Sequence, residues 1–285
     1  MSNFRRRFGQ QADSKQPAMP PRDVAALAAP LAVPAVQVVK SEAPSLSHFG
    51  GSPELPATMT WPEFKGKKLD FLARLSLPEI LAALPIDWLP STGALLFFYA
   101  MKEQPWGFDP KDRGSCAVLL VPDLAQARSA PDDPRRDPES CLLPYYGVSF
   151  RRVNVLPSRE RDSVSALKLS IAEADVYCDL VAQVFGDQPK HQVGGLPYPV
   201  QGDAMELECQ LASNGLHCGD PSGYKDPRAE ALKSGAAKWR LLFQFDSDDD
   251  LDVMWGDAGT IYYWIDESAA RSGNFTNPWL ILQCC

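Results

Sequence analysis

The chain has 285 residues, which is long enough for one large domain or two smaller ones, and its 45% hydrophobic and 22% charged residues are typical of globular proteins. The formal net charge of −8 argues against general nucleic-acid binding. No apolar run is long enough to span a bilayer, so we expect no membrane insertion.

Residues 1–44 differ in composition from the rest of the chain. Positions 1–40 contain five prolines and six basic residues against two acidic ones. Such a segment buries too little apolar surface to fold, so we predict a disordered basic Pro/Ala-rich tail with one short helix near Asp23–Leu31. The pair Arg5-Arg6 fits a twin-arginine export signal badly, because a long polar stretch separates it from the apolar residues.

The seven cysteines show no framework spacing. Cys209, His217 and Cys218 lie close together in the sequence, but no Cys-x-x-Cys pair accompanies them. We therefore expect neither a metal nor another cofactor. Free thiols predict a reducing, cytoplasmic location.

Short apolar runs bounded by Pro and Gly predict the secondary structure of the first half. We expect buried strands over Leu69–Leu77, Gly93–Ala100 and Cys116–Pro122. Pro78 and Pro85 enclose a short helix between the first two strands. The segment Ser129–Ser140 is rich in Pro and charge, which predicts a loop.

The strongest helical pattern covers residues 163–185. Its apolar residues recur at spacings of three and four, which predicts one amphipathic helix that packs on a sheet and bridges two halves of the chain. Asp162 or Ser163 would cap its start, and Gly186 would close it. Further on, we expect a helix over Asp226–Trp239 and strands over Trp239–Asp248, Gly259–Asp266 and the C-terminal residues.

The two halves, residues 45–150 and 187–285, share an order of features. Each begins with a histidine (His48 or His191) and a Gly-Gly-x-Pro turn, then continues with an apolar strand and a Gly-opened aromatic strand. Internal duplication is the economical explanation, and chance alignment of short strands is the alternative. The predicted fold class is α+β, β-rich and mainly antiparallel, with an internal duplication and a few packed helices.

Six stretches of the sequence closely resemble the YwqG-like bacterial proteins, a family of unknown function. They are "HFGGSPELPATMTWP", "LDFLARLSL", "GALLFFY", "HQVGGLPYPVQGD", "LLFQFDSD" and "MWGDAGTIYYWI". The resemblance covers roughly residues 45–285, and its most specific part is the pair of Gly-Gly-x-Pro turns together with "WGDAG". The usual Gln of the first strand is Arg74 here, whereas its second-half counterpart, Gln244, is present. The family implies a mixed α+β fold and brings no assigned activity or catalytic residues.

The Gly-Gly-x-Pro turns are the first candidate ligand-binding sites. Gly194 and Gly195 permit positive φ and expose amides that a ligand could use. No helix or Lys-Ser/Thr follows as in a phosphate loop, which favours a structural turn. Acid/base or ligand-orienting chemistry could come from three neighbours, His191, Gln201 and Asp203. His48 is the expected counterpart of His191, and the alternative to a site is that both histidines are structural and each bonds a neighbouring turn.

The acidic stretch Asp246–Asp257 places Asp at positions 1, 3, 5, 7 and 12 of a calcium-loop count. Leu251 occupies the position that needs Gly, and strands flank the stretch, so we expect a solvated turn. Trp255 is either a pocket wall or a core residue, and Asp257 could brace the turn. With Gln244, they complete the candidate ligand-binding residues.

Two classes of function fit these features. The acidic body and the lack of a recognisable catalytic motif favour a non-catalytic binding or interaction protein, of which a toxin-neutralising protein is a specific version. The alternative is a small-molecule enzyme, whose acid/base groups His191 and Asp203 or Asp257 would converge in a cleft between the halves. A third hypothesis is a regulatory module anchored through its basic tail to an anionic partner. The sequence does not distinguish a protein partner from a small molecule.

Overall fold

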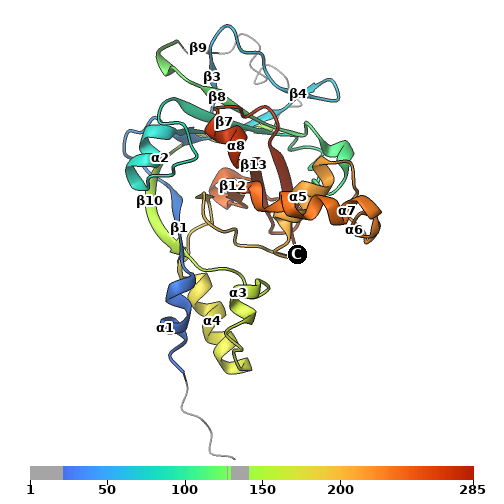
Figure 1. The fold of residues 1–285 in the computed structure, drawn as a ribbon. Coiled ribbons are helices and arrows are strands. Elements are labelled where there is room, and N and C mark those ends of the chain that lie inside the picture. Colours follow the sequence, from blue (N-terminus) through green and yellow to red (C-terminus); the bar gives the residue numbers. More distant parts are fainter. Residues whose placement is uncertain (1–21, 127, 130–140) are drawn as a thin grey trace, which may run out of the picture.

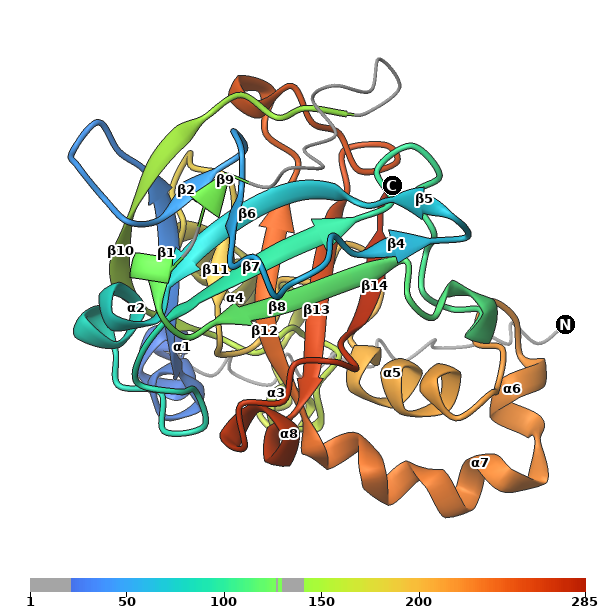
Figure 2. The same cartoon turned by 90° about the horizontal axis from the view of Figure 1, so that it is seen from above.

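The computed structural model describes residues 22–126, 128–129 and 141–285. Ten strands form one strongly curved antiparallel sheet in the order β14-β13-β12-β11-β1-β10-β2-β6-β7-β8 (Figures 1 and 2). Their bounds are β1 Val33–Lys40, β2 His48–Phe49, β6 Asp70–Ser76, β7 Ala94–Tyr99, β8 Cys116–Val121, β10 Tyr146–Val155, β11 Gln192–Val193, β12 Trp239–Asp246, β13 Thr260–Asp266 and β14 Trp279–Gln283. The fold is therefore α+β and mainly antiparallel, as predicted.

Two short two-stranded pairs, eight α-helices and several 3₁₀ helices complete the described structure. The pairs are β3 Glu54–Leu55 with β9 Arg128–Ser129, and β4 Glu63–Phe64 with β5 Lys67–Lys68. The helices are α1 Val24–Ala28, α2 Leu77–Ala83, α3 Asp162–Ser165, α4 Ile171–Gln183, α5 Met205–Ser213, α6 Ser222–Lys225, α7 Pro227–Leu232 and α8 Glu267–Arg271. None of the helices in the described part of the chain is long and apolar enough to cross a membrane.

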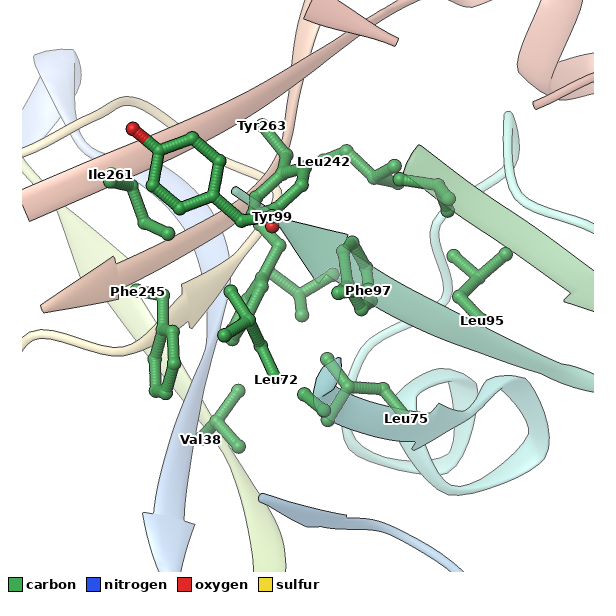
Figure 3. Packing of buried hydrophobic residues seen from close by; sticks show 14 of the residues in the cluster. Val38, Leu72, Leu75, Leu95, Phe97, Tyr99, Leu242, Phe245, Ile261 and Tyr263 are labelled. Atoms are coloured by element: carbon green, nitrogen blue, oxygen red, sulfur yellow. The ribbon is translucent and has the colours of Figure 1, made fainter. Parts of the chain in front are cut away.

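The main hydrophobic core lies on the inner side of the curved sheet. Figure 3 shows Val38, Leu72, Phe97, Phe245 and Tyr263 pointing toward one another from β1, β6, β7, β12 and β13. All five side chains are almost completely buried. One core therefore joins the two halves, and burial of its aromatic side chains supplies much of the driving force for folding.

The predicted strands are present as β6, β7, β8, β12, β13 and β14. Other side chains cover part of their outer face, in addition to the core on the inner face. Leu241 and Tyr262 pack beneath α5, and Phe71 and Phe98 pack against Trp61. Strands buried on both faces have nearly continuous apolar sequences, which is the pattern that identified them. The short helix after β6 is also confirmed as α2. The predicted helix 226–239 forms α7 and continues as a 3₁₀ segment to Lys238.

The prediction of a disordered tail is wrong for residues 22–44. Residues 24–31 form α1 and a 3₁₀ turn, which confirms the short helix, and residues 33–40 form the central strand β1. β1 pairs along its whole length with β10 and at Val36 and Gln37 with β11, which places it inside the sheet. The rest of the predicted tail, residues 1–21, and residues 130–140 of the predicted polar loop lie outside the described residues.

The single bridging helix predicted over residues 163–185 is also wrong. Lys168 adopts a positive φ of 50°, and Ser170 then starts α4 with a capping box that it shares with Glu173. Ile171 of the predicted apolar face is 85% exposed, whereas Tyr177 is the buried contact of α4 with α1. Helices α1, α3 and α4 therefore form a group beside the sheet (Figure 1), and the halves are joined by strands instead.

The two sides of the sheet show the same strand arrangement: on each side of the central strands β1 and β10, the strands follow one another outward in sequence order. One side contains β2, β6, β7 and β8, and the other contains β11, β12, β13 and β14. The β6–β7 and β12–β13 pairs each contain a register shift, at Leu72 and at Leu242 respectively. The strands expected to correspond, β6 and β12, therefore occupy matching places in the sheet.

Candidate functional site

The two Gly-Gly turns have backbone conformations that favour glycine. Gly50 and Gly51 have φ of 55° and 69°, and Gly194 and Gly195 have φ of 68° and 69°. A Cβ on Gly195 would lie 2.6 Å from the Cβ of Ala35 in β1. Positive φ and close packing both explain these glycines, which supports the interpretation of the motif as a structural turn.

His48 and His191 are not counterparts, contrary to the sequence interpretation. His48 precedes its Gly-Gly pair by two residues, and Gln192 does the same in the other half. His48 Nδ1 bonds to Gly50 O at 2.9 Å, and Gln192 Nε2 donates to Gly194 O at 2.7 Å. His191 instead matches Ser47, since the two side chains accept a backbone N–H from the last residue of β12 and of β6.

His191 is buried at the centre of a polar network. Its Nδ1 accepts the backbone N–H of Asp246 at 3.1 Å, so the other ring nitrogen, Nε2, carries the proton and donates to Asp248 Oδ2 at 3.1 Å. Burial lowers the pKa of His191, which keeps the ring neutral. Burial alone would raise the pKa of Asp248, but hydrogen bonds from His191 and Lys40 lower it to about 2.

The acidic turn between β12 and β13 is less solvated than we predicted. Lys40 Nζ donates to Asp248 Oδ1 at 2.6 Å and also pairs with Asp250, and the side chain of Asp248 is only 2% exposed. Asp248 also caps the short 3₁₀ helix Asp249–Leu251. The carboxylates of Asp248 and Asp250 therefore hold the end of β1, through Lys40, against this turn. No cluster of three or more metal-ligating side chains occurs in the described ranges 22–126, 128–129 and 141–285.

Three further candidate residues lie at separate places. Gln244 is buried and joins Lys190 O to the backbone N–H of Tyr198. Trp255 is a fully buried core residue whose Nε1–H has no partner within the described structure. Asp257 is exposed, and its backbone carbonyl accepts the N–H of Cys285.

Asp203 lies in an ion-pair cluster at the start of α5. Its side chain is completely buried, accepts the Ser158 hydroxyl at 2.7 Å and accepts Arg161 Nε at 2.6 Å. Arg161 also pairs with Glu206 at 2.8 Å. Asp203 thus joins the segment before α3 to α5, and both of its carboxylate oxygens accept hydrogen bonds from this segment.

A cavity of about 520 Å³ lies beside Gly194 and Gly195. Trp88, Trp239 and Trp264 contribute to its wall. Its charged side chains are paired within the protein, Arg161 with Asp203 and Glu206, Asp87 with Arg271, and Arg240 with Glu267. This cavity therefore offers an apolar wall with little unpaired charge.

A cavity of about 730 Å³ with titratable groups lies between the segment after β7 and the segment around α5, and we call it the acidic cleft. Figure 2 shows the green turn at Pro110–Asp112 close to α5 and α6. The two walls meet where Cys218 N–H donates to Phe108 O at 2.8 Å. The cleft is lined by Glu103, Gln104, Pro105, Trp106, Phe108, Asp109, Asp112, Gln201, Glu208, His217, Cys218 and Gly219.

Glu208 is the most perturbed carboxyl group of this cleft. Burial raises its pKa to about 7, the nearby carboxylates of Glu206 and Asp203 add to the increase, and a hydrogen bond from Tyr224 partly opposes it. The Tyr224 hydroxyl contacts Glu208 Oε1 at 3.3 Å, whereas Oε2 is shielded from solvent and has no partner among the described residues. A carboxyl group that titrates near neutrality inside a cleft is characteristic of functional sites.

Exposed apolar side chains of Trp106, Tyr224 and Met254 lie in the wall of the acidic cleft or contact it, and we call this exposed surface the entrance to the cleft. Trp106 is 44% exposed and Tyr224 is 38% exposed. Met254 is 55% exposed, and its carbonyl accepts a hydrogen bond from Gln104 of the cleft wall. Aromatic residues and Met are enriched at protein interfaces, so this entrance has the composition of a contact surface.

Of the candidate residues named from the sequence, Gln201 alone lines the acidic cleft, and Gly194 and Gly195 line the other cavity. Sequence reasoning missed Glu208 as a site residue, and it considered His217 only together with Cys209 and Cys218 as metal ligands. A signal for Glu208 exists, because Met205, Cys209 and Ala212 recur at helical spacing and are buried, which places Glu208 beside an apolar helix face. An acidic residue at such a position is an indicator of a perturbed pKa.

Comparison with known proteins places the chain in a family without giving it an activity. No curated protein matches the chain. A family model described as a domain of unknown function, DUF1963, matches residues 47–284. This match includes both Gly-Gly turns and both walls of the acidic cleft, and it leaves β1 outside. The chain therefore belongs to the DUF1963 family.

Proposed function

We propose that this chain is a non-catalytic binding protein that holds its ligand, or a side chain of its partner, in the acidic cleft. The observation that carries this proposal is the Glu208 carboxyl group, which lies within a cavity of about 730 Å³ with one oxygen unpartnered. Cavities of several hundred cubic ångströms with apolar walls and a few polar groups are typical of ligand sites. Gln201 is the residue of the cleft that the sequence had already singled out.

The entrance favours a protein partner over a free small molecule. Trp106, Tyr224 and Met254 expose apolar surface at this place, and such residues frequently act as interface anchors. The net charge of −8 would attract a basic partner and increase its association rate. A toxin-neutralising role is one version of this proposal, in which the chain covers a basic toxin.

An enzyme acting on a small molecule is the second candidate, and one observation favours it. Glu208 titrates at about pH 7, which suits a group that accepts and donates protons at neutral pH. His217 lies in the same cleft and is 42% exposed. In this version Glu208 and His217 are the acid/base groups. They replace His191, Asp203 and Asp257, which the sequence suggested for these roles and which make hydrogen bonds within the fold.

Three finer inferences accompany the proposal. Within the DUF1963 family, the chain is a YwqG-like protein, on the strength of its two Gly-Gly-x-Pro turns and "WGDAG". The two halves descend from an internal duplication, which the matching strand order and the register shifts at Leu72 and Leu242 support. The location is cytoplasmic, which agrees with seven free cysteines.

The proposal is tested with a variant that fills the acidic cleft. Gln201→Trp places a large ring in the cleft from an exposed position, and Gln183→Trp on the exposed face of α4 is the matched control. Native mass spectrometry of each protein, purified from the cells that produce it naturally, measures what stays bound. We expect bound material on the wild type and on Gln183→Trp, chemically unchanged after prolonged incubation, and its loss from Gln201→Trp. Equal occupancy in all three proteins would overturn the cleft as the binding site, and steady conversion of the bound molecule would favour the enzyme.

A further inference from the structure

Among the described residues, the lining of the acidic cleft contains carboxyl groups but no basic Lys or Arg side chain. Four of its lining residues are acidic, namely Glu103, Asp109, Asp112 and Glu208. None of the lining residues, all of which belong to the described part of the chain, is Lys or Arg. A cavity with this composition has a negative potential, which the low-dielectric walls focus.

Three of the four carboxyl groups already have strong partners. Glu103 accepts from Lys67 Nζ at 2.9 Å, Asp109 accepts the backbone N–H of Lys111 at 2.9 Å, and Asp112 accepts the N–H of Gly107 at 2.9 Å. These contacts hold the wall of the cleft in place. Glu208 differs from these three groups because one of its carboxyl oxygens, Oε2, is buried and has no partner among the described residues.

The hydroxyl group of Tyr224 covers the Glu208 carboxyl group through a weak hydrogen bond. The Tyr224 hydroxyl lies 3.3 Å from Oε1, which is long for an O–H···O bond, and Oε2 has no partner in the described structure. Tyr224 belongs to α6, a helix of four residues, and its side chain is partly exposed. Movement of the Tyr224 ring would open the carboxyl group to a donor in the cleft. A hydrogen bond to a buried acceptor that had no donor is favourable, because it removes the cost of the unsatisfied group.

The aromatic wall favours the same kind of ligand. Trp106 and Phe108 line the cleft with ring centroids 6.5 Å apart, and the Trp106 ring is partly exposed. The face of an indole attracts cations, and Arg in particular stacks on it. His217 has Asp109 and Asp220 within 4.0 Å and is too exposed to repel a cation strongly.

We infer that the acidic cleft recognises a guanidinium group, the side chain of an arginine on a partner protein, which donates to Glu208 in place of Tyr224 and stacks on Trp106. This inference rests on the proposed function, because it names the group that the cleft takes. Arginine fits better than lysine here, since its planar donors match a carboxylate and an aromatic face together.

The protonation of Glu208 predicts how the affinity for a guanidinium group changes with pH. The ionisable groups that face Glu208 are Tyr224 of α6, Glu206 of the same helix, Asp203 before it and Cys218 of the cleft wall. Burial, together with the carboxylates of Glu206 and Asp203, raises the pKa of Glu208 and keeps it partly protonated at neutral pH. A guanidinium binds the carboxylate and expels the proton, so its affinity rises as pH increases through about 7. A neutral ligand that accepts from the protonated carboxyl group would show the opposite trend.

The test compares two probes that differ in charge and are nearly identical in shape. Acetyl-arginine amide carries the guanidinium, and acetyl-citrulline amide replaces it with a neutral urea. Binding is measured from the shifts of the Trp106 indole N–H signal in ¹H–¹⁵N spectra at pH 6 and pH 8. We expect the arginine probe to bind more tightly at pH 8 and about tenfold or more weakly to Glu208→Gln. Glu230→Gln is the control, because it removes an exposed carboxylate that lies outside the cleft lining and is already paired with Lys233.

The outcomes separate this inference from the proposed function. If both probes bind equally, and Gln201→Trp abolishes both interactions, the cleft is a binding site but the inferred arginine specificity is wrong. If the arginine probe binds equally to wild type and Glu208→Gln, or if it binds more tightly at pH 6, Glu208 is not its acceptor. If the arginine probe causes no shift up to its solubility limit, the inference is overturned, while retention of another molecule by the wild type would leave the proposed function standing.

Discussion

His48 and Gln192 make the same hydrogen bond in the two halves of the sheet. Each lies two residues before the first glycine of its Gly-Gly pair, and each bonds through its side chain to the carbonyl oxygen of that glycine, at 2.9 Å from His48 and 2.7 Å from Gln192. A ring nitrogen and an amide nitrogen therefore do the same work at corresponding turns. The turn needs a donor at this position, and its chemical identity is secondary.

The first prediction follows from this equivalence. His48→Gln should fold and keep the bond to Gly50, whereas His48→Ala should lose about 1 kcal/mol at pH 7. Burial and the nearby Arg74 lower the pKa of His48 to about 4, below its ordinary 6.5. Its stabilising contribution is therefore present above pH 6.5 and is lost as pH falls through 4. Urea unfolding of wild type and His48→Gln at pH 7 and pH 4.5 checks this, and a Gln variant as acid-sensitive as the wild type would contradict it.

The second prediction separates backbone strain from steric clash at the glycine turns. Gly195→Val combines a φ of 69° with a Cβ 2.6 Å from Ala35, so it should destabilise the fold by more than about 3 kcal/mol. Gly186→Val is the control, because Gly186 has a φ of 60° and nothing within 4 Å of the added Cβ, which leaves a cost of about 1–2 kcal/mol. Thermal melts compare the two variants. Equal losses would show that contact with β1 is unimportant.

The third prediction concerns the buried histidine. His191→Ala removes the acceptor for Asp246 N–H and one donor to the buried Asp248, and it leaves a cavity beside Phe245 and Phe49. The expected loss is about 2–4 kcal/mol in the free energy of unfolding. His217→Ala serves as the exposed control and should melt like the wild type. If His191→Ala is as stable as the control, the network around Asp248 does not hold β1 to the turn.

The fourth prediction uses the titration of Glu208. Its pKa of about 7 lies above the ordinary value of 4.5, so its stabilising contribution is complete below pH 4.5 and is lost as pH rises through 7. Glu208→Gln should therefore unfold with nearly the same free energy as wild type at pH 4.5 and be more stable by on the order of 2 kcal/mol at pH 8. Denaturant titrations at both pH values measure this. A variant that is less stable at pH 8 would contradict it.

Individual strands show which parts of the fold can be predicted from the sequence. β7 and β13 read as apolar runs because both faces are covered, and their bounds were predicted to within a residue. β1 was missed because Pro30 and Pro34 gave the segment the composition of a tail, although Pro34 is tolerated close to the strand's beginning. β10 was missed because Arg151 and Arg152 interrupt its alternation of apolar and polar residues.

The candidate site was harder to predict for a physical reason. Side chains with acid/base chemistry, such as His191 and Asp203, are also the side chains that fill buried hydrogen-bond networks, and sequence does not separate the two uses. The acidic cleft joins residues 103–112 to residues 201–219, so its formation depends on tertiary packing that no local pattern reveals. Glu208 gains its unusual pKa through this packing.

The central claim, that Glu208 is the acceptor of a binding cleft, is tested most directly by measuring its pKa with and without a probe. Selective ¹³C labelling of glutamate side chains gives the Cδ signal of each carboxyl group, and Glu208→Gln identifies the relevant signal. The account predicts a titration near pH 7 in the free protein, which moves to lower pH when acetyl-arginine amide is added. A titration near pH 4.5 that does not change with the probe would contradict the account.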